Sequence, residues 1–446
     1  MPWVEWRGNS CRVRWETGKL HPETGKKLFD SKSSTKWTET EAYDYGLDRE
    51  SDVRNDRYIS RRDGSVLMED LCPAWLALQD LAYDSIRAYR TVITAQIIPY
   101  WGDRAVGDIS VPEYDAWANQ VRAKWSRNYA QSILMVFGLI MNYAVECEMR
   151  KSSPVIKRTR RGRFVKKARP RKRPLDMAVV HQLAMNAHTV WGFPGYVFFL
   201  TVPFTGLRRS EMFGLRREFA SPTWPASDPR ADPEETERYD DDMERYGQGE
   251  GLMPALRVEY QHKWMHGRPT LTAPKYESSR TLVLPPFLSR LHEQLLASHT
   301  SEWMFPAIGG GPLIRSNWSI SYYGPITLGA EERVGKRARS KIPPVEAWRV
   351  RQPDGEWGPK RMHLLRHGHK EWLDEDEKHS RVAVEARMGH EVAGVEGLYG
   401  NVTPTMERRI MAALEERWAA FAAAQGPGWA PPAPIPLPVD QEDIAG

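Results

Sequence analysis

The sequence has little cysteine, and its cysteines stand far apart. The 446 residues contain only Cys11, Cys72 and Cys147, with no CxxC pair. This spacing argues against a disulfide framework and against a zinc knuckle, and it is typical of a protein from a reducing cytosol.

Long hydrophobic runs are also missing. The N-terminal segment Met-Pro-Trp-Val-Glu-Trp-Arg has no apolar signal core. The longest apolar run, from Ile133 to Val145, is too short to cross a bilayer and predicts a buried helix instead. We therefore expect a soluble cytoplasmic protein with no membrane partner.

Acidic residues are absent from one stretch of the chain. Residues 150–174 hold thirteen Lys or Arg and no Asp or Glu, so the overall net charge of +5 leaves about −8 for the remainder. Prolines at 154, 170 and 174 indicate a linker, either a flexible tether or a binding segment for a polyanion such as nucleic acid. The candidate DNA contacts are Arg158, Arg160, Arg161, Arg163, Lys166, Lys167, Arg169, Arg171, Lys172 and Arg173.

The length and composition predict several domains. Residues 1–66 indicate a small β-rich module, because short aromatic and β-branched runs flank Gly8-Asn9, a hairpin signal. Residues 67–150 show helical periodicity and predict a helical bundle centred on the apolar helix near 133–144. A basic linker is expected at 151–174.

Residues 175–425 predict a larger, mostly helical domain with a β-rich stretch. Its segment 221–250 has ten acidic and three basic residues and indicates a disordered surface insertion. The tail 426–446 is rich in Pro and Ala and is expected to be disordered. The fold class is therefore mainly α with small β-sheets.

Three short motifs in the larger domain carry chemistry. They are Thr205-Gly-Leu-Arg208-Arg-Ser-Glu211, His363-Leu-Leu-Arg366-His367, and Met388-Gly-His390 followed nine residues later by Tyr399. Arginines bind phosphate oxygens in a bidentate manner, histidines move protons near neutral pH, and a phenol oxygen can be a nucleophile. These are the groups needed to attack a phosphodiester without a metal.

Each motif alone has a plainer interpretation. Arg208 and Glu211 could form a surface salt bridge at a helix start, and Tyr399 could be an aromatic at a helix end. His363 and His367 stand at i and i+4, a spacing that can bind zinc. The zinc peptidase motif requires glutamate after its first histidine, however, and Leu364 stands there. We expect neither a metal nor a cofactor.

Taken together and in this order, the motifs resemble the tyrosine recombinases, or phage-type integrases. The resemblance implies that Arg208, His363, Arg366 and His390 are catalytic, that Tyr399 is the nucleophile, and that Glu211 and His367 support them. Met388 replaces the family's leucine, a volume-conserving change, and Asn401 stands where many members have histidine.

The resemblance also implies a lysine general acid on a β-hairpin. Lys275 is the candidate, within Thr270-Leu-Thr-Ala-Pro-Lys275-Tyr-Glu-Ser-Ser-Arg280, which predicts two short strands around a polar turn; Lys263 is the rival. The implied reaction forms a 3′-phosphotyrosyl DNA bond without ATP or metal.

The family layout implies further partners. An arm-binding module, a core-binding (SAM-like) helical domain and a catalytic domain would act on double-stranded attachment sites in bacterial, nucleoid-associated DNA. A helix beginning at Thr403-Pro404 has an apolar stripe from Met406 to Phe421, which packs either on its own domain or on a neighbouring protomer. We expect it to help assemble a homo-tetramer, with an excision directionality factor as a further candidate partner.

The sequence leaves two other functions open. A type IB topoisomerase would share the attack chemistry, although the arm-like module and the Met-Gly-His box favour a recombinase that integrates a phage or mobile element. A DNA-binding regulator could keep the fold and lose catalysis, but all six catalytic positions hold the expected residue types.

Overall fold

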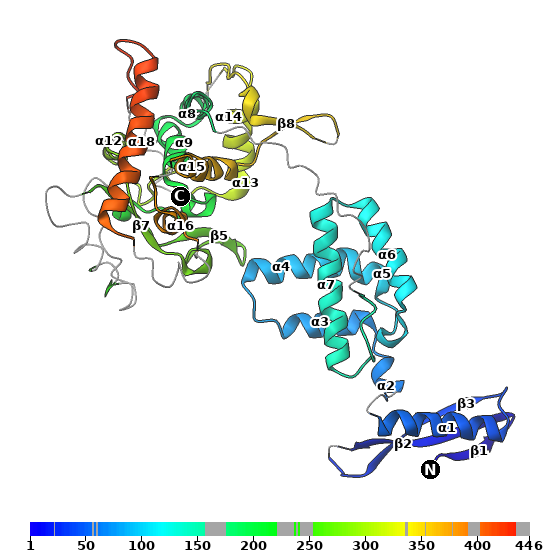
Figure 1. Ribbon diagram of the computed structural model, residues 1–446. Helices are drawn as coiled ribbons and strands as arrows, with labels where there is room; N and C mark the ends of the chain where they lie inside the picture. Colours follow the sequence, from blue (N-terminus) through cyan, green and yellow to red (C-terminus); the bar gives the residue numbers. More distant parts are fainter. Residues whose placement is uncertain are drawn as a thin grey trace, which may run out of the picture. The chain divides into compact units, whose positions relative to one another are not determined.

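The computed structural model describes residues 1–21, 23–55, 58, 61–156, 175–220, 236–237, 240, 253–334, 338–352, 354–376, 378–390 and 402–433. The chain divides into two compact units, Met1–Lys167 and Ala168–Gly446. Helices predominate and the sheets are small, which confirms the predicted fold class (Figure 1). The predicted domain boundaries remain a prediction.

The N-terminal part is a three-stranded antiparallel sheet with one helix on it. Strands β1 (Trp3–Arg7), β2 (Ser10–Leu20) and β3 (Lys27–Ser34) pair in the order β1-β2-β3, and the turn at Gly8-Asn9 joins the first two as predicted. Helix α1 (Glu39–Arg54) begins with a capping box formed by Thr38 and Glu41. A small core of Cys11, Val13, Trp15 and Ala42 lies between the sheet and the helix.

The helical part that follows has its own core. Its elements are α2 (Arg61–Gly64), α3 (Met68–Ala77), α4 (Tyr83–Val92), a π-helical turn (Ile93–Ile97), α5 (Ile98–Trp101), a 3₁₀ turn (Val106–Asp108), α6 (Val111–Lys124) and α7 (Arg127–Glu146). The apolar face of α7, including Ile133, Phe137 and Ile140, is fully buried, which confirms it as the centre of the bundle.

The larger unit is built around a buried helix. All thirteen residues of α9 (Phe193–Thr205) are buried, because nearly every one is apolar and other helices cover every side. The other helices are α8 (Met177–Trp191), α10 (Arg209–Gly214), α12 (Pro286–Ala297), α13 (Arg315–Asn317), α14 (Gly324–Leu328), α15 (His363–Asp374), α16 (Arg381–Met388) and α18 (Pro404–Ala424). Shorter turns are 3₁₀ at Arg217–Phe219, Lys275–Glu277 and Glu346–Trp348 and π-helical at Trp318–Tyr323.

The strands of this unit form three two-stranded sheets. They pair β4 (Ala255–Val258) with β7 (Arg280–Val283), β5 (Gln261–Met265) with β6 (Arg268–Thr272), and β8 (Arg349–Arg351) with β9 (Trp357–Pro359). The predicted hairpin across Lys275 is therefore wrong in its pairing. The flanking strands β6 and β7 exist, but each pairs with a different partner, because most of β7 is buried in the domain whereas β6 is exposed or half-buried.

The C-terminal helix α18 packs on its own domain. Ile410, Leu414 and Trp418 are buried, and the ring of Trp418 stacks on Phe287 of α12 with centroids 4.4 Å apart. This is the plainer of the two sequence interpretations. The apolar stripe is used inside the domain, so the prediction that it links protomers loses its basis.

The start of the C-terminal tail is packed. The ring of Trp429 lies 5.8 Å from that of Trp418 and 5.9 Å from that of Phe421. Trp429 therefore packs on the apolar end of α18, whereas residues 426–428 are exposed. The predicted start of the tail at residue 426 remains a prediction. Residues 434–446 lie outside the described part, as do 157–174 of the basic linker and most of the acidic insertion.

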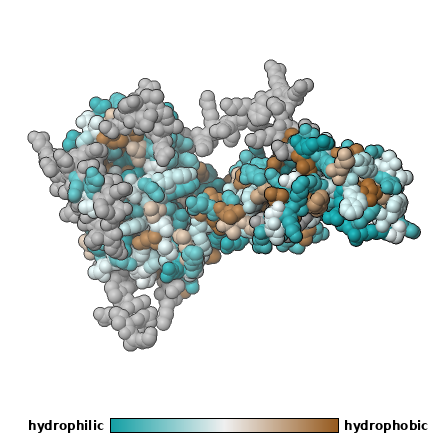
Figure 2. All heavy atoms as spheres, turned by 90° about the horizontal axis from the view of Figure 1, so that it is seen from below, coloured by the Kyte–Doolittle hydropathy of each residue, from teal (hydrophilic) through white to brown (hydrophobic). Residues whose placement is uncertain are grey.

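The surface is mixed in character. On the face in Figure 2, hydrophobic residues form small groups separated by hydrophilic ones. Among the described residues, none of the helices combines the length and the apolar character that a membrane span requires.

Candidate active site

Arg208 is positioned by the end of the buried helix α9. The chain leaves α9 at Gly206, which adopts a left-handed φ of 70°. A side chain there would meet the ring of His369 at 2.7 Å and the sulfur of Met388 at 2.8 Å, so glycine is required both for the turn and for the close packing. Arg208 then stands at the N-cap of α10, with its side chain 16% exposed.

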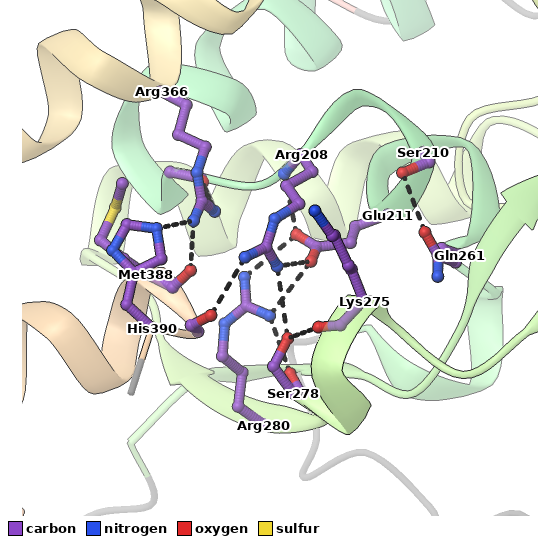
Figure 3. A network of polar contacts seen from close by, with 12 residues as sticks. Arg208, Ser210, Glu211, Gln261, Lys275, Ser278, Arg280, Arg366, Met388 and His390 are labelled. Carbon is purple, nitrogen blue, oxygen red and sulfur yellow. Dashed lines mark hydrogen bonds and ion pairs between the residues drawn. The ribbon is translucent and has the colours of Figure 1, made fainter. Parts of the chain in front are cut away.

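The guanidinium of Arg208 is held on several sides. Its Nη1 donates to Glu211 Oε1 at 2.6 Å and to Ser278 Oγ at 3.3 Å, and its Nη2 donates to the carbonyl of Gly389 at 3.0 Å. The backbone N–H of Arg208 donates to the other Glu211 oxygen at 2.8 Å. Three contacts of the guanidinium leave this cation little rotational freedom (Figure 3).

Glu211 is fully buried between two arginines. In addition to Arg208, Arg280 of β7 places its Nη2 3.1 Å from Glu211 Oε2. Burial acts to raise the pKa of Glu211, but attraction to Arg280 and Arg208 and their hydrogen bonds lower it overall. The carboxylate is therefore ionised and fixes both guanidinium groups; its supporting role in catalysis remains a prediction.

Arg366 lies on α15 and is 2% exposed. Its Nη1 donates to the carbonyl of Gly206 at 2.6 Å, and its Nη2 donates to the carbonyl of Met388 and contacts His390 Nε2 at 2.9 Å. Burial and the neighbouring Arg208 lower the pKa of Arg366 to about 9, so it remains a cation at pH 7. The first and second motifs thus meet at the end of α9.

His390 follows the turn that ends α16. Gly389 has a φ of 62°, and a Cβ there would lie 2.9 Å from Arg280 Nη1, so this position also requires glycine. The ring Nε2 of His390 faces Arg366, and its Nδ1 lies 2.7 Å from Glu385 Oε2. The third motif therefore joins the other two (Figure 3).

His363 and His367 lie together at the start of α15. Their rings meet edge to face with centroids 4.7 Å apart. His363 keeps an exposed edge, but partial burial and then the positive neighbours His367, Arg366, Arg208 and His390 lower its pKa to about 4. His363 is therefore neutral at pH 7, the form that can accept a proton.

Lys275 stands at the turn between β6 and β7. Its carbonyl accepts a hydrogen bond from Ser278 Oγ at 2.9 Å, and Ser278 in turn contacts Arg208. Its Nζ lies 4.6 Å from the centroid of the Tyr276 ring. Tyr276 and Glu277 both have positive φ, 63° and 50°, a backbone strain that clusters at functional sites. The rival, Lys263, lies on β5 opposite Thr270.

The remaining predicted residues lie outside the described part of the chain. Tyr399 falls within residues 391–401, and all ten candidate DNA contacts fall within 157–174. The helices on either side of the Tyr399 segment contact each other. Arg387 Nη1 of α16 lies 3.3 Å from Glu407 Oε2 of α18 in a buried ion pair.

Three residues that the motif reading did not assign also belong to this network. Arg280 pairs with Glu211 and donates its Nε to the carbonyl of Arg387 at 2.9 Å, Ser278 contacts Arg208, and Glu385 contacts His390. Arg280 could have been found in the sequence, because it is a charged residue directly before the apolar end of a predicted strand. No spacing rule singles out Glu385 from the other acidic residues of the chain.

The arrangement gathers more positive than negative charge. Arg208 and Arg280 contact Glu211, and Arg366 contacts His390, which also contacts Glu385, so three arginines stand against two carboxylates, with Lys275 at the neighbouring turn. Pre-aligned donors of this kind bind an anion with planar oxygen pairs, such as a phosphodiester.

Comparison with solved structures identifies the fold. No protein-family model matches the sequence, and no curated protein sequence matches it. An arginine-to-lysine variant of a Tn1549 transposon integrase fragment, in complex with a circular intermediate DNA, is 13% identical with a TM-score of 0.50. The match covers 78% of this chain and 100% of that one.

Two further structures are similar. A tyrosine-to-phenylalanine variant of the same integrase fragment, in complex with transposon right end DNA, is 13% identical over 78% of this chain and 99% of that one, with a TM-score of 0.50. A lambda integrase tetramer bound to a Holliday junction is 12% identical over 90% of this chain and 96% of that one, with a TM-score of 0.49. From the Tn1549 comparisons, this chain has the tyrosine recombinase, or phage-type integrase, fold.

Proposed function

We propose that this chain is a site-specific DNA recombinase, an integrase of a phage or mobile element. It cuts and rejoins DNA through a 3′-phosphotyrosyl intermediate. The observation that carries the proposal is the convergence of Arg208, Arg366 and His390 at the end of α9, in a chain with the integrase fold.

The proposed reaction begins with the scissile phosphate on the arginines. Arg208 and Arg366 hold its non-bridging oxygens, and His390 donates a further hydrogen bond as charge builds on the pentacoordinate transition state. Tyr399 Oη attacks phosphorus, its proton passes to neutral His363, and the bond to the 5′ oxygen breaks. Lys275 gives a proton to that oxygen, which leaves as a hydroxyl.

Rejoining reverses these steps. A 5′ hydroxyl of the partner strand attacks the phosphotyrosyl bond and releases Tyr399. The number of phosphodiester bonds is unchanged, so no ATP is consumed. Because the two steps are chemically equivalent, the same residues act in both directions.

The N-terminal sheet supports a second DNA contact. The face away from α1 carries Arg14 beside Trp3 across the β1–β2 pair, and the Arg14 guanidinium lies 5.4 Å from the exposed Phe29 ring. A basic surface with exposed aromatics fits a nucleic acid groove and backbone. We assign it to arm-type sites, with the basic linker adding phosphate contacts.

Assembly into a tetramer on paired sites also belongs to the proposal, because exchange between two duplexes requires four cleavages. The apolar stripe of α18 is not the connecting surface, since it is buried in its own domain. Deleting residues 404–446 would therefore test folding rather than assembly. A directionality factor remains a candidate partner.

Incubation with nicked attachment-site DNA tests the proposal. The site can be found from short direct repeats in the DNA that flanks the gene. Cleavage next to a nick releases a short strand that diffuses away, so a covalent adduct accumulates. A recombinase gives a protein band shifted by the attached strand. A chain that binds the site without an adduct would be a catalytically silent regulator.

The effect of substituting Lys275 on the cleavage rate is expected to depend on the leaving group. Lys275→Ala should slow cleavage about 100-fold on normal DNA, because a general acid contributes at least that much. With sulfur in place of the 5′ oxygen, the variant should cleave within about threefold of the wild type, since a thiolate leaves without a proton. Single-turnover rates on both substrates measure this. Lys263→Ala is the matched control, and the same pattern there would transfer the role to Lys263.

The pH dependence of cleavage should reflect His363. Because burial and positive neighbours lower the pKa of His363 to about 4, its neutral form persists well below pH 6.5. We expect the acid limb of kcat/KM, which reports the free enzyme, to be centred near pH 4, where His363 becomes protonated. An acid limb centred near pH 6.5 would contradict this assignment.

A further inference from the structure

The ring of His390 is held within a closed chain of polar contacts that links α15 and α16. Lys370 Nζ lies 2.7 Å from Glu385 Oε1, and Glu385 Oε2 lies 2.7 Å from His390 Nδ1. His390 Nε2 lies 2.9 Å from Arg366 Nη2. Arg366 and Lys370 stand one turn apart on α15, which closes the chain.

Glu385 is the acid that contacts His390, and it is ionised; Lys370 also pairs with Asp374 at 3.1 Å. The side chain of Glu385 is 15% exposed. Burial acts to raise the pKa of Glu385, but hydrogen bonds and attraction to Lys370 and His390 lower it overall. A carboxylate can only accept hydrogen bonds, so the contact at His390 Nδ1 requires a hydrogen on that nitrogen.

The other ring nitrogen leads to the same assignment. A guanidinium has donors and no acceptor, so the Arg366 contact makes Nε2 the acceptor in the neutral ring. Both partners therefore select the Nδ1–H tautomer, and together they fix the ring plane. This is the arrangement in which a carboxylate orients a functional histidine through the nitrogen away from its target.

The charges explain why a carboxylate is needed here. Within the described part of the chain, the charged or titratable groups around His390 include Arg366, Arg208, His363, Lys370 and Glu385. To donate from Nε2 to a phosphate oxygen, the ring must carry a hydrogen on both nitrogens and thus a positive charge among other cations. Glu385 offsets that charge directly.

We propose that Glu385 is a positioning residue for DNA cleavage: it orients His390 through Nδ1, and it offsets the positive charge of the ring once Nε2 gains a proton, leaves its contact with Arg366 and donates to the scissile phosphate. Lys370 holds Glu385 in place. The inference rests on the proposed function, because it assigns a partner to a group that acts in that reaction.

Single-turnover cleavage at saturating nicked DNA tests the coupling. Glu385→Gln keeps an acceptor and loses the charge, and we expect about a tenfold lower rate; Glu385→Leu loses both and should lose about 100-fold. The DNA dissociation constant should change less than about twofold. In a His390→Asn background, Glu385→Gln should not lower the cleavage rate further, because the imidazole ring that Glu385 orients is absent.

The control is Glu375→Gln, which changes a half-exposed acid at the end of α15 that contacts Arg417 and should leave the rate unchanged. The proposal is overturned if Glu385→Gln cleaves at the wild-type rate, or if it slows cleavage equally in both backgrounds. A general loss of stability would produce the second result, and melting temperatures of all variants identify it.

A measurement without DNA separates this inference from the proposed function. Nitrogen-15 NMR of histidine-labelled protein, with the His390 signal assigned by its absence in His390→Asn, reports which ring nitrogen carries hydrogen. We expect the Nδ1–H form in the wild type and its loss in Glu385→Leu. If the protein cleaves no DNA but gives this spectrum, the proposed function fails while the orienting contact stands. An Nε2–H ring in the wild type overturns the inference.

Discussion

Replacement of Tyr399 by phenylalanine is expected to stop formation of the covalent adduct. The rate should fall at least about 10⁴-fold, because removing the nucleophile of a covalent mechanism removes nearly all of the chemical step. DNA binding should stay within about twofold, since the arginines and the basic linker are untouched. Gel analysis of adducts on nicked DNA, beside a binding titration, measures both.

The matched control for this change is Tyr100→Phe. Tyr100 lies in α5, is 44% exposed and packs against Trp101 and Trp117, far from the motifs in sequence. Its loss of a hydroxyl should leave adduct formation unchanged. An adduct that persists in Tyr399→Phe would remove Tyr399 from the mechanism.

Substitution of Arg366 by lysine should have the second largest effect, a loss of about 10²- to 10³-fold in the cleavage rate. Each pre-aligned donor at a developing negative charge is worth about this much. Arg366 uses its two terminal nitrogens to reach Gly206, Met388 and His390. A lysine keeps the charge but has a single nitrogen, so it cannot hold this geometry and bind a phosphate bidentately.

The comparison for Arg366→Lys is Arg361→Lys, two positions before α15 on the exposed surface. The same chemical change there should leave the rate within about twofold. Because Arg366 is buried, the melting temperature of each variant must accompany the rate. A folded Arg366→Lys variant with wild-type cleavage would show that the clamp is not needed.

Much of the local structure could be predicted from the sequence because local signals decide it. The turn at Gly8-Asn9 forms as expected. Short-range hydrogen bonds likewise specify the capping boxes at Thr38 and Ser110. The helix α7 is central because a continuous apolar face, which includes Ile133, Phe137 and Ile140, has to be buried, although Met135 and Leu139 on its other side are exposed. These elements depend little on the rest of the chain.

Long-range partners were harder to predict. The residues around Lys275 indicate two strands and a turn, yet nothing local says that β7 pairs with β4 and β6 with β5. The apolar stripe of α18 predicts that this face of the helix is buried, but it does not predict which surface covers it. Glu385 is one acid among many until the fold brings it within 2.7 Å of His390.

The motif residues were predictable for a different reason. Arg208, Arg366 and His390 were selected by their order and spacing, and the fold brings them together through two glycine turns, at Gly206 and Gly389. The roles of these residues, and that of Tyr399, remain proposals that only chemistry can test.

Mapping of the protein–DNA bond by mass spectrometry tests the central claim most directly. Adduct trapped on nicked attachment-site DNA would be digested with nuclease and protease, and the modified peptide sequenced. We predict a nucleotide joined through its 3′ phosphate to the oxygen of Tyr399. A nucleotide on another residue, or the absence of any modified peptide while DNA is bound, would contradict the account.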